Sequence, residues 1–371
     1  MTRHYLDHAS TSPARPEVVA AMVPWLSGAA DPGRVHTEGR VARAVVEAAR
    51  DQVAALLGAR SREVVFTSGA TEAIAAAVWG AGERGGHMVV PAVEHSAVRD
   101  ASARFEVTEV GVDRLGRVDP DEVVAAIRPG ETALVHVQWA NHEVGTLQPV
   151  AEVVAACREQ GVLVHVDAAA AAGHVPIDFV ALGADLLSVS AHKLGGPQGI
   201  GALLVRRGLR LRPLLVGGEQ ERARRAGMEN VPAIVGFGAA ATTLARPGAL
   251  DDEADRNRAQ TEVVVAAAVA VRGVEAFGDI DRRVPHLVCF GVEGVEAEPV
   301  LLGLDQAGVA AHSGSSCSSE SLEPSPVLEA MGVPAERSLR VSVGWSTTDD
   351  DVEAFVRAFP MVVERLRSLR S

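Results

Sequence analysis

Short runs rich in valine and leucine alternate with alanine-rich stretches between residues 60 and 245. The runs are four to six residues long and cover residues 64–67, 87–90, 132–137, 162–166, 185–190 and 201–205. Such short, mostly apolar runs are typical of strands buried on both faces, and the stretches between them have the length of helices. The alternation predicts an α/β fold with a mostly parallel sheet flanked by helices.

The pattern changes near residues 246–252, where proline, glycine and two aspartates interrupt the apolar runs. We expect a long helix up to about residue 271, then strands at 286–290 and 339–343 and helices at 298–307 and 349–369. A chain of 371 residues is long enough for two domains. We predict a large domain over residues 13–250 and a smaller α/β domain formed by residues 1–12 and 251–371.

Composition excludes several classes of protein. The chain has 35 Lys and Arg against 48 Asp and Glu, a net charge of −13, which argues against a nucleic-acid partner. Its three cysteines are too few and too scattered for a disulfide framework or a four-ligand zinc site. The first residues lack the apolar run of a signal peptide, and the apolar stretch at 262–272 is about half a membrane span. We expect a cytoplasmic protein with no metal and no membrane contact.

Lys193 is the only lysine among the 35 Lys and Arg residues. Arginine can replace lysine wherever a cation faces water, but it cannot lose its proton and act as a nucleophile. Lys193 follows a predicted strand and is flanked by Ser190, His192 and glycines. It is therefore a candidate catalytic amine, and the alternative is a surface lysine with no special role.

Other polar residues also follow predicted strands and should meet in one crevice, because ligands bind at the carboxyl ends of parallel strands. They include residues 68–71, residues 141–143 and Asp167. Asp167 either caps a helix or pairs with a protonated pyridine nitrogen, as an acid does in enzymes that use pyridoxal phosphate (PLP). Residues 68–71 (Ser-Gly-Ala-Thr) open a helix, a position that suits a phosphate group or a simple N-cap.

Three further residues are candidates for the site. His95 follows the strand at 87–90 and can stack on a flat cofactor, relay a proton or serve only as a capping residue. Cys317 lies in a serine-rich stretch, where it is either a reactive thiolate or an inert loop thiol. Cys157 and Cys289 lie in apolar runs and are assigned to packing. Arg340, in an apolar strand, can bind a substrate carboxylate or form an internal ion pair.

Together these motifs resemble the cysteine desulfurases of the NifS/IscS type, which have the class V aminotransferase fold and use PLP. The resemblance covers nearly the whole chain, and two motifs around Cys317 are specific for desulfurases. It is carried by residues 5–9 (Tyr-Leu-Asp-His-Ala), 36–40 (His-Thr-Glu-Gly-Arg), 63–72 (Glu-Val-Val-Phe-Thr-Ser-Gly-Ala-Thr-Glu), 94–95 (Glu-His), 139–145 (Trp-Ala-Asn-His-Glu-Val-Gly), 165–167 (His-Val-Asp), 190–193 (Ser-Ala-His-Lys), 195–197 (Gly-Gly-Pro), 313–317 (Ser-Gly-Ser-Ser-Cys) and 321–325 (Ser-Leu-Glu-Pro-Ser).

The resemblance implies a seven-stranded sheet of PLP fold type I and a set of cofactor contacts. Lys193 would hold PLP covalently, Asp167 would pair with the ring nitrogen, and His95 would stack on the ring and help to move protons. The phosphate would be held by Ala70, Thr71, Ser190 and His192.

The resemblance also implies the substrate, L-cysteine, and the partners. Arg340 and Asp31 would bind the substrate. Cys317 would take its sulfur as a persulfide and pass it to an acceptor protein that the sequence does not identify. The serine-rich loop resembles that of the first desulfurase subgroup, and a homodimer is also implied.

Four places depart from the family pattern. One is the Gly-Asn pair before His36, where this sequence has Ala30-Asp31. His142 stands in place of an asparagine and Ala170 in place of a glutamine, both of which contact the cofactor's phenolic oxygen in the family; His142 can replace one contact. Met228 stands in place of a threonine that reaches the phosphate across the dimer. Each lost hydrogen bond is worth roughly 0.5–1.5 kcal/mol. Two alternatives therefore stay open: a PLP-dependent C–S lyase or β-eliminating enzyme, and a degenerate PLP-fold protein that acts as a partner in a sulfur-transfer complex.

Overall fold

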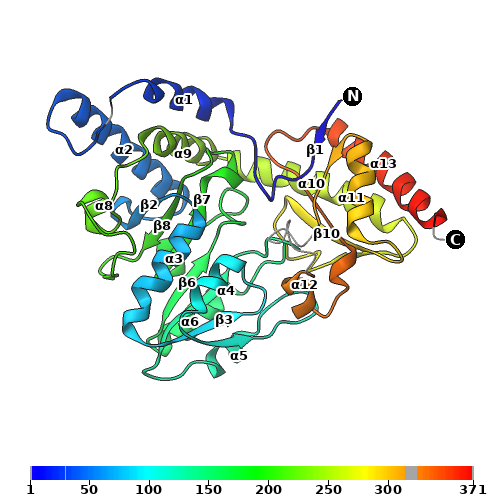
Figure 1. The fold of residues 1–371 in the computed structure, drawn as a ribbon, viewed down its shortest axis with the longest axis horizontal. Coiled ribbons are helices and arrows are strands. Elements are labelled where there is room, and N and C mark those ends of the chain that lie inside the picture. Colours follow the sequence, from blue (N-terminus) through cyan, green and yellow to red (C-terminus); the bar gives the residue numbers. More distant parts are fainter. Residues whose placement is uncertain (1, 30, 314–323, 370–371) are drawn as a thin grey trace.

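The computed structural model describes residues 2–29, 31–313 and 324–369. Its main element is a seven-stranded sheet with the strand order β2-β8-β7-β6-β5-β3-β4 (Figure 1). The strands are β2 (Val64–Thr67), β3 (His87–Pro91), β4 (Glu106–Val110), β5 (Thr132–Gln138), β6 (Leu163–Asp167), β7 (Leu186–Ser190) and β8 (Gly201–Val205). Strand β8 runs antiparallel to both its neighbours, and the other adjacent pairs are parallel. The prediction of a mostly parallel sheet is confirmed.

The predicted strands agree with the observed ones because their apolar runs are buried on both faces. Strand β4 was not predicted. It lies at the edge of the sheet, and most of its residues are exposed. Its sequence, Glu-Val-Thr-Glu-Val, lacks the continuous apolar run that marks the buried strands.

Helices cover both faces of this sheet. On one face lie α2 (Thr37–Leu56), α6 (Val150–Glu159), α7 (Phe179–Leu182) and α9 (Val231–Leu244), and on the other lie α3 (Ala70–Ala81) and α4 (Ser96–Ser102). The shorter or peripheral helices are α1 (Pro16–Leu26), α5 (Pro120–Ala125) and α8 (Gln220–Ala223). Within the described part of the chain, no helix has both the length and the apolar character that crossing a bilayer requires.

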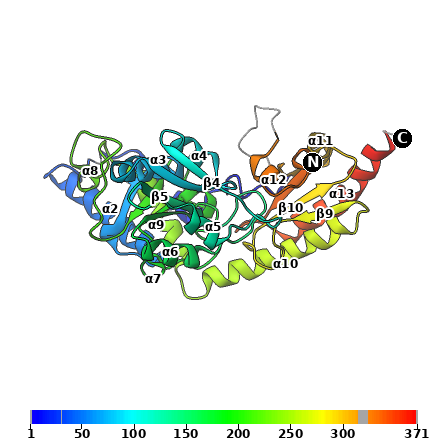
Figure 2. The same ribbon diagram turned by 90° about the horizontal axis from the view of Figure 1, so that it is seen from below.

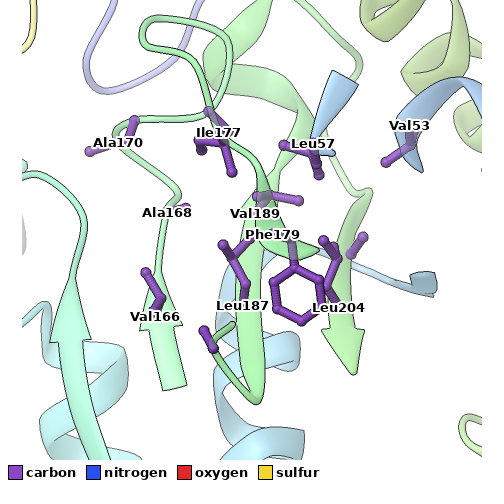
Figure 3. Packing of buried hydrophobic residues seen from close by; sticks show 14 of the residues in the cluster. Val53, Leu57, Val166, Ala168, Ala170, Ile177, Phe179, Leu187, Val189 and Leu204 are labelled. Carbon is purple, nitrogen blue, oxygen red and sulfur yellow. The ribbon is translucent and has the colours of Figure 1, made fainter. Parts of the chain in front are cut away.

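Figure 3 shows how the core reaches the carboxyl end of β6. Phe179 lies beside Leu187 of β7 and Leu204 of β8, and all three side chains are buried. Beyond β6, the chain turns through Ala168 and Ala170, which are also buried. Small side chains let this turn pack closely against the sheet, directly after the candidate acid Asp167.

Helix α10 (Ala249–Val269) extends from the region of the large sheet to a second, smaller sheet (Figure 2). The smaller sheet is antiparallel with the order β12-β10-β9, formed by β9 (Val274–Phe277), β10 (Leu287–Val292) and β12 (Ser338–Ser342). Its core also includes residues of α10, α11 (Ala297–Gln306) and α13 (Asp349–Ser368). Helix α12 (Pro326–Ala330) packs in a separate small cluster.

The amino-terminal segment lies beside residues near the end of the chain. Strand β1 (His4–Tyr5) pairs in parallel with β11 (Val309–Ala310), and Asp7 forms a bridge with Ser342. From there the segment passes over the large sheet, where the Ser12 N–H donates to the His192 carbonyl (3.0 Å). The domain boundaries given above stay a prediction.

Candidate active site

A cavity of about 510 Å³ lies at the carboxyl ends of β5, β6 and β7. Its wall contains residues 68–72, His95, His142, Asp167, Ala170, Ser190, His192, Lys193 and Arg340. The structure thus brings together most of the residues that the sequence predicts to meet in one crevice. Asn141 and Glu143, predicted with them, do not line the cavity. Their individual roles stay predictions.

Lys193 lies in a short 3₁₀ turn, η3 (Ala191–Leu194), that follows β7. The turn ends at Gly195 in the left-handed conformation (φ +82°), where a Cβ atom would lie 2.7 Å from the Arg15 side chain. Arg15 holds this turn, because its Nε donates to the Leu194 carbonyl (3.1 Å) and its amide donates to the Gly195 carbonyl (2.9 Å). Arg15 is itself fixed by both carboxylate oxygens of Glu253, each 2.9 Å away.

Asp167 is the last residue of β6, and its side chain is buried at the cavity wall. Its Oδ1 accepts hydrogen bonds from the Ser188 hydroxyl (3.2 Å) and from the Ala169 amide (3.0 Å). The second bond closes a turn after β6. No helix begins in residues 168–178, so the helix-cap alternative for Asp167 is wrong. Both bonds fix the carboxylate at the edge of the cavity, where it can serve as partner for a cationic group.

The start of α3 forms another part of the wall. Its N-cap residue, Gly69, has no side chain to occupy the first amides of the helix, and a Cβ there would meet no atom within 4 Å. Glu72 accepts a hydrogen bond from the Ser68 amide (2.8 Å) and pairs with Arg225 (2.8 Å). Burial alone would raise the pKa of Glu72, but the hydrogen bonds from Arg225 and Ser68 outweigh it and lower the pKa. The positive charge of Arg225 thus neutralises the negative charge of Glu72 beside the start of α3.

His95 is a capping residue, one of the roles that the sequence left open, and its stacking and proton-relay roles stay predictions. Its Nδ1 accepts a hydrogen bond from the Ala97 amide (3.0 Å), so it caps α4, and its ring lies against the cavity. Because Nδ1 accepts, the proton of the neutral ring is on Nε2. The ring of His142 meets that of His95 edge-on, with centroids 4.9 Å apart.

Ser190 is the last residue of β7, and His192 lies in η3 directly before Lys193. The Nδ1 of His192 is 3.1 Å from the Thr11 hydroxyl. Burial, with a smaller contribution from the charge of Lys193, lowers the pKa of His192 to about 4. The ring is therefore neutral at pH 7 and can donate one hydrogen bond.

Arg340 lies on β12, is 1% exposed and still contributes to the cavity wall. Its Nη2 pairs with Asp7 (3.0 Å) and donates to the Ser10 hydroxyl (2.7 Å), and its Nη1 donates to the His142 carbonyl (3.0 Å). The internal ion pair, one of the two alternatives for Arg340, is present, and binding of a substrate carboxylate stays a prediction.

Two predicted site residues are not part of the cavity as described. Cys317 lies outside the described residues. Asp31 does not line the cavity; its carboxylate accepts from Arg34 Nε (2.9 Å) and from the Gly33 amide (2.9 Å). The two other cysteines are buried in apolar clusters, as predicted, and burial raises the pKa of Cys157 and of Cys289 to about 12.

Some wall residues were not singled out from the sequence. Gln138 ends β5, so the rule that ligands bind at strand ends would have identified it. Ser10, Thr11 and Gln198 lie in irregular segments. No periodic pattern points to those three, because they reach the cavity only through the tertiary fold.

Comparison with known proteins identifies the family. The model of class V aminotransferases matches residues 4–355. The chain belongs to the class V aminotransferase family. Among curated class V relatives, "Cysteine desulfurase" of Trichormus azollae is 42% identical over 379 residues, covering 98% of this chain and 94% of the relative. "Cysteine desulfurase IscS" of Methanosarcina thermophila is 40% identical over 379 residues, covering 98% and 93%.

Solved structures of the class V fold agree with this assignment. A NifS-like protein from Rickettsia africae has a TM-score of 0.90 and 28% identity, covering 98% of this chain and 99% of that protein. The structure described as SspA in complex with cysteine has a TM-score of 0.82 and 30% identity, covering 92% and 99%. The resemblance to cysteine desulfurases and the fold that it implied are confirmed.

Proposed function

We propose that this class V protein is a PLP-dependent cysteine desulfurase that converts L-cysteine to L-alanine and retains the sulfur as a persulfide on Cys317. One observation carries the proposal: the chain's only lysine shares a single cavity with Asp167, the start of α3 and Arg340. Such a cavity offers a nucleophilic amine, an acid, a phosphate-binding helix end and a carboxylate-binding cation in one place.

The residues of the cavity fit PLP. About 510 Å³ accommodates a cofactor together with a small amino acid. The buried carboxylate of Asp167 suits a protonated ring nitrogen, and Gly69 leaves space beside the first amides of α3 for a phosphate. When bound, PLP supplies an electron sink for the electrons released at the substrate's carbon atoms.

The individual roles in the reaction are assigned to side chains of this protein. Lys193 would hold the cofactor and move a proton at the substrate Cα, and His95 would stack on the cofactor and act as a second proton carrier. Arg340 orients the substrate carboxylate, and Asp31 is assigned to substrate binding. The remaining contacts to the cofactor are assigned to Ala70, Thr71, His142, Asp167, Ser190 and His192.

Sulfur transfer is assigned to Cys317. Its thiolate attacks Sγ of the substrate, so an S–S bond forms and the bond between Cβ and Sγ breaks. The electron pair of that bond stays with the substrate, which takes up a proton and leaves as L-alanine. No external oxidant or reductant is consumed, because the two electrons lost by the pair of sulfur atoms are gained by the substrate Cβ, which becomes a methyl carbon. An acceptor protein then takes the outer sulfur of the persulfide.

A homodimer and a cytoplasmic location belong to the same proposal. Helix α1 exposes the apolar side chains of Val19, Val23 and Leu26, which are 49%, 55% and 67% exposed. They border a groove of about 530 Å³. An apolar face of this kind is typical of a surface covered by a second copy. The cytoplasm supplies the reducing conditions that a reactive thiol needs.

Product analysis tests the proposal. The PLP-loaded protein is incubated with L-cysteine and a reducing thiol, and we expect equal amounts of L-alanine and sulfide. The Cys317→Ala variant should lose sulfide release and keep bound PLP, whereas Lys193→Ala should lose covalently held PLP. Pyruvate and ammonia would identify a C–S lyase instead. Failure to bind PLP, seen as no visible absorbance with excess cofactor, would favour the degenerate binding protein.

A further inference from the structure

The guanidinium of Arg340 is held by the amino-terminal segment, 333 residues earlier in the chain. Asp7 Oδ1 accepts from Arg340 Nη2 (3.0 Å) and from the Ser10 hydroxyl (3.0 Å). Ser10 Oγ in turn lies 2.7 Å from Arg340 Nη2. The three side chains form a closed triangle of hydrogen bonds at the cavity wall.

Few other contacts fix this arginine. Its Nη1 donates to the His142 carbonyl (3.0 Å), and its Nε is buried without a hydrogen-bond partner among the described residues. The orientation of the guanidinium around its long axis therefore depends on Asp7 and Ser10. A buried cation also needs a compensating charge when no substrate is bound, and Asp7 is the carboxylate with which Arg340 forms an ion pair.

Asp7 is itself held in place. Its carbonyl accepts from the Tyr5 hydroxyl (3.1 Å), and that hydroxyl also donates to the Thr11 carbonyl (2.8 Å). Its backbone bridges to Ser342 on β12, two residues beyond the arginine. The carboxylate is thus attached to the same strand that carries Arg340, so the ion pair has a fixed geometry. Asp7 does not line the cavity, whereas Ser10 and Arg340 do.

We propose that Asp7 is a positioning residue that aims Arg340 at the carboxylate of the bound amino acid, with Ser10 as its second contact. This inference rests on the proposed function, which assigns Arg340 to that carboxylate. Bidentate binding of a carboxylate by arginine requires the plane of the guanidinium to be fixed in advance. Asp7 supplies that orientation and neutralises the arginine in the empty site.

Binding of L-alanine, the expected product, tests the inference without turnover. Calorimetry of L-alanine binding to the PLP-loaded wild type is compared with the Asp7→Asn variant, which keeps the shape and an acceptor oxygen but loses the charge. We expect the dissociation constant to rise roughly tenfold, since the hydrogen bond from Arg340 to residue 7 loses its charged acceptor and orients the guanidinium less firmly. Ser10→Ala should raise it roughly threefold, since a neutral contact is lost. Asp305→Asn, which alters an exposed ion pair with Arg3, is the matched control and should leave it unchanged.

A second comparison distinguishes a loss of Arg340 orientation from a general loss of activity in the Asp7→Asn variant. Cysteamine lacks the carboxylate of cysteine, so its consumption should be equally slow in the wild type and in Asp7→Asn. With L-cysteine, KM should rise roughly tenfold in the variant while kcat changes little. An equal loss with both substrates would overturn the positioning role, and so would unchanged L-alanine binding by Asp7→Asn. If Asp7→Asn does not fold, unchanged L-alanine binding by Ser10→Ala overturns it.

The outcomes also separate this inference from the proposed function. If wild-type protein makes no alanine from cysteine but binds L-alanine in a manner weakened by Asp7→Asn, the desulfurase assignment fails and the positioning role stands. If wild-type protein binds no L-alanine at all, the positioning role is wrong.

Discussion

At the scale of single residues, charged groups in the cavity wall are fixed by contacts from distant parts of the chain. Arg340 is paired with Asp7, and Glu72 is paired with Arg225. Lys193 is held indirectly, because Arg15 binds the carbonyls on either side of the turn's end. Because these polar groups are already fixed in place, little free energy is needed to reorient them when a ligand binds. This preorganisation is the main physical contribution that a protein makes to such a site.

Lys193→Arg tests whether position 193 needs an amine that can lose its proton. The variant keeps the charge but should lose covalent attachment of PLP, because guanidinium stays protonated. Wild type and variant are loaded with PLP, reduced with borohydride and digested with a protease. The mass of the peptide that contains residue 193 is then measured by mass spectrometry. We expect the cofactor's mass on the wild-type peptide and none on the variant peptide.

A control for this experiment adds a lysine elsewhere. Arg206 is half exposed and does not line the cavity, so Arg206→Lys combined with Lys193→Arg offers a solvent-facing amine outside it. We expect no label at position 206. Equal labelling at position 206 in the double variant and at position 193 in the wild type would mean that exposure alone decides the reaction.

At the scale of elements, the segment around α8 has the most unusual backbone. Glu221, Arg222 and Ala223 have φ values of +49°, +59° and +58°. Such left-handed residues cost roughly 1–2 kcal/mol each unless other contacts hold them. Here Glu221 is buried, and its carboxylate accepts two hydrogen bonds from Arg50 (2.6 and 2.7 Å) and one from the Phe66 amide (2.8 Å). The ion pair therefore holds the strained turn against β2.

Ala223→Gly should raise stability, because glycine adopts positive φ without the Cβ clash that alanine suffers. We expect a gain of about 0.5–1 kcal/mol in the free energy of unfolding, after subtracting the entropy that glycine adds to the unfolded chain. Urea unfolding measures it. The same substitution at Ala44, exposed in the middle of α2, is the matched control and should cost about 1 kcal/mol. If Ala223→Gly lowered the free energy of unfolding as Ala44→Gly does, the backbone strain inferred at Ala223 would be contradicted.

At the scale of the whole molecule, histidines are buried at many places. Burial is the main cause that lowers the pKa of seven of them, namely His8, His87, His136, His165, His174, His192 and His286. The pKa falls to about 3 for His136 and His174. In the unfolded chain these groups titrate near about 6.5. Between the two values the unfolded state binds more protons than the folded state.

The free energy of unfolding should therefore fall as the pH drops from about 6.5 towards 4. Each histidine contributes at most about 1.4 kcal/mol per pH unit. Glu94 and Glu229 act in the opposite direction, since burial raises the pKa of each, but they are outnumbered. Urea unfolding at pH 7.5, 6.0 and 5.0 measures the slope. His36→Asn, at a side chain 56% exposed, should leave the slope unchanged. Constant stability over this range would contradict the prediction.

The sequence predicts much of the fold and a good part of the site, for physical reasons that differ by residue. Lys193 is recognisable because one lysine among many arginines is improbable without a reason, and Asp167 because it ends a buried strand. Asp7 and Ser10 could not be found in this way, since their link to Arg340 spans the whole chain. The edge strand β4 was missed because its exposed residues leave no apolar run.

The course of residues 4–15 has a consequence for how the protein matures. These residues leave the ribosome long before their partners Val309, Arg340 and Ser342 are synthesised. Contacts of such long sequence separation form late and slowly. A nascent chain can complete its large sheet and still lack a finished substrate pocket. The nascent protein should therefore be inactive until the strand that carries Arg340 has left the ribosome, and incompletely synthesised chains should not release sulfur.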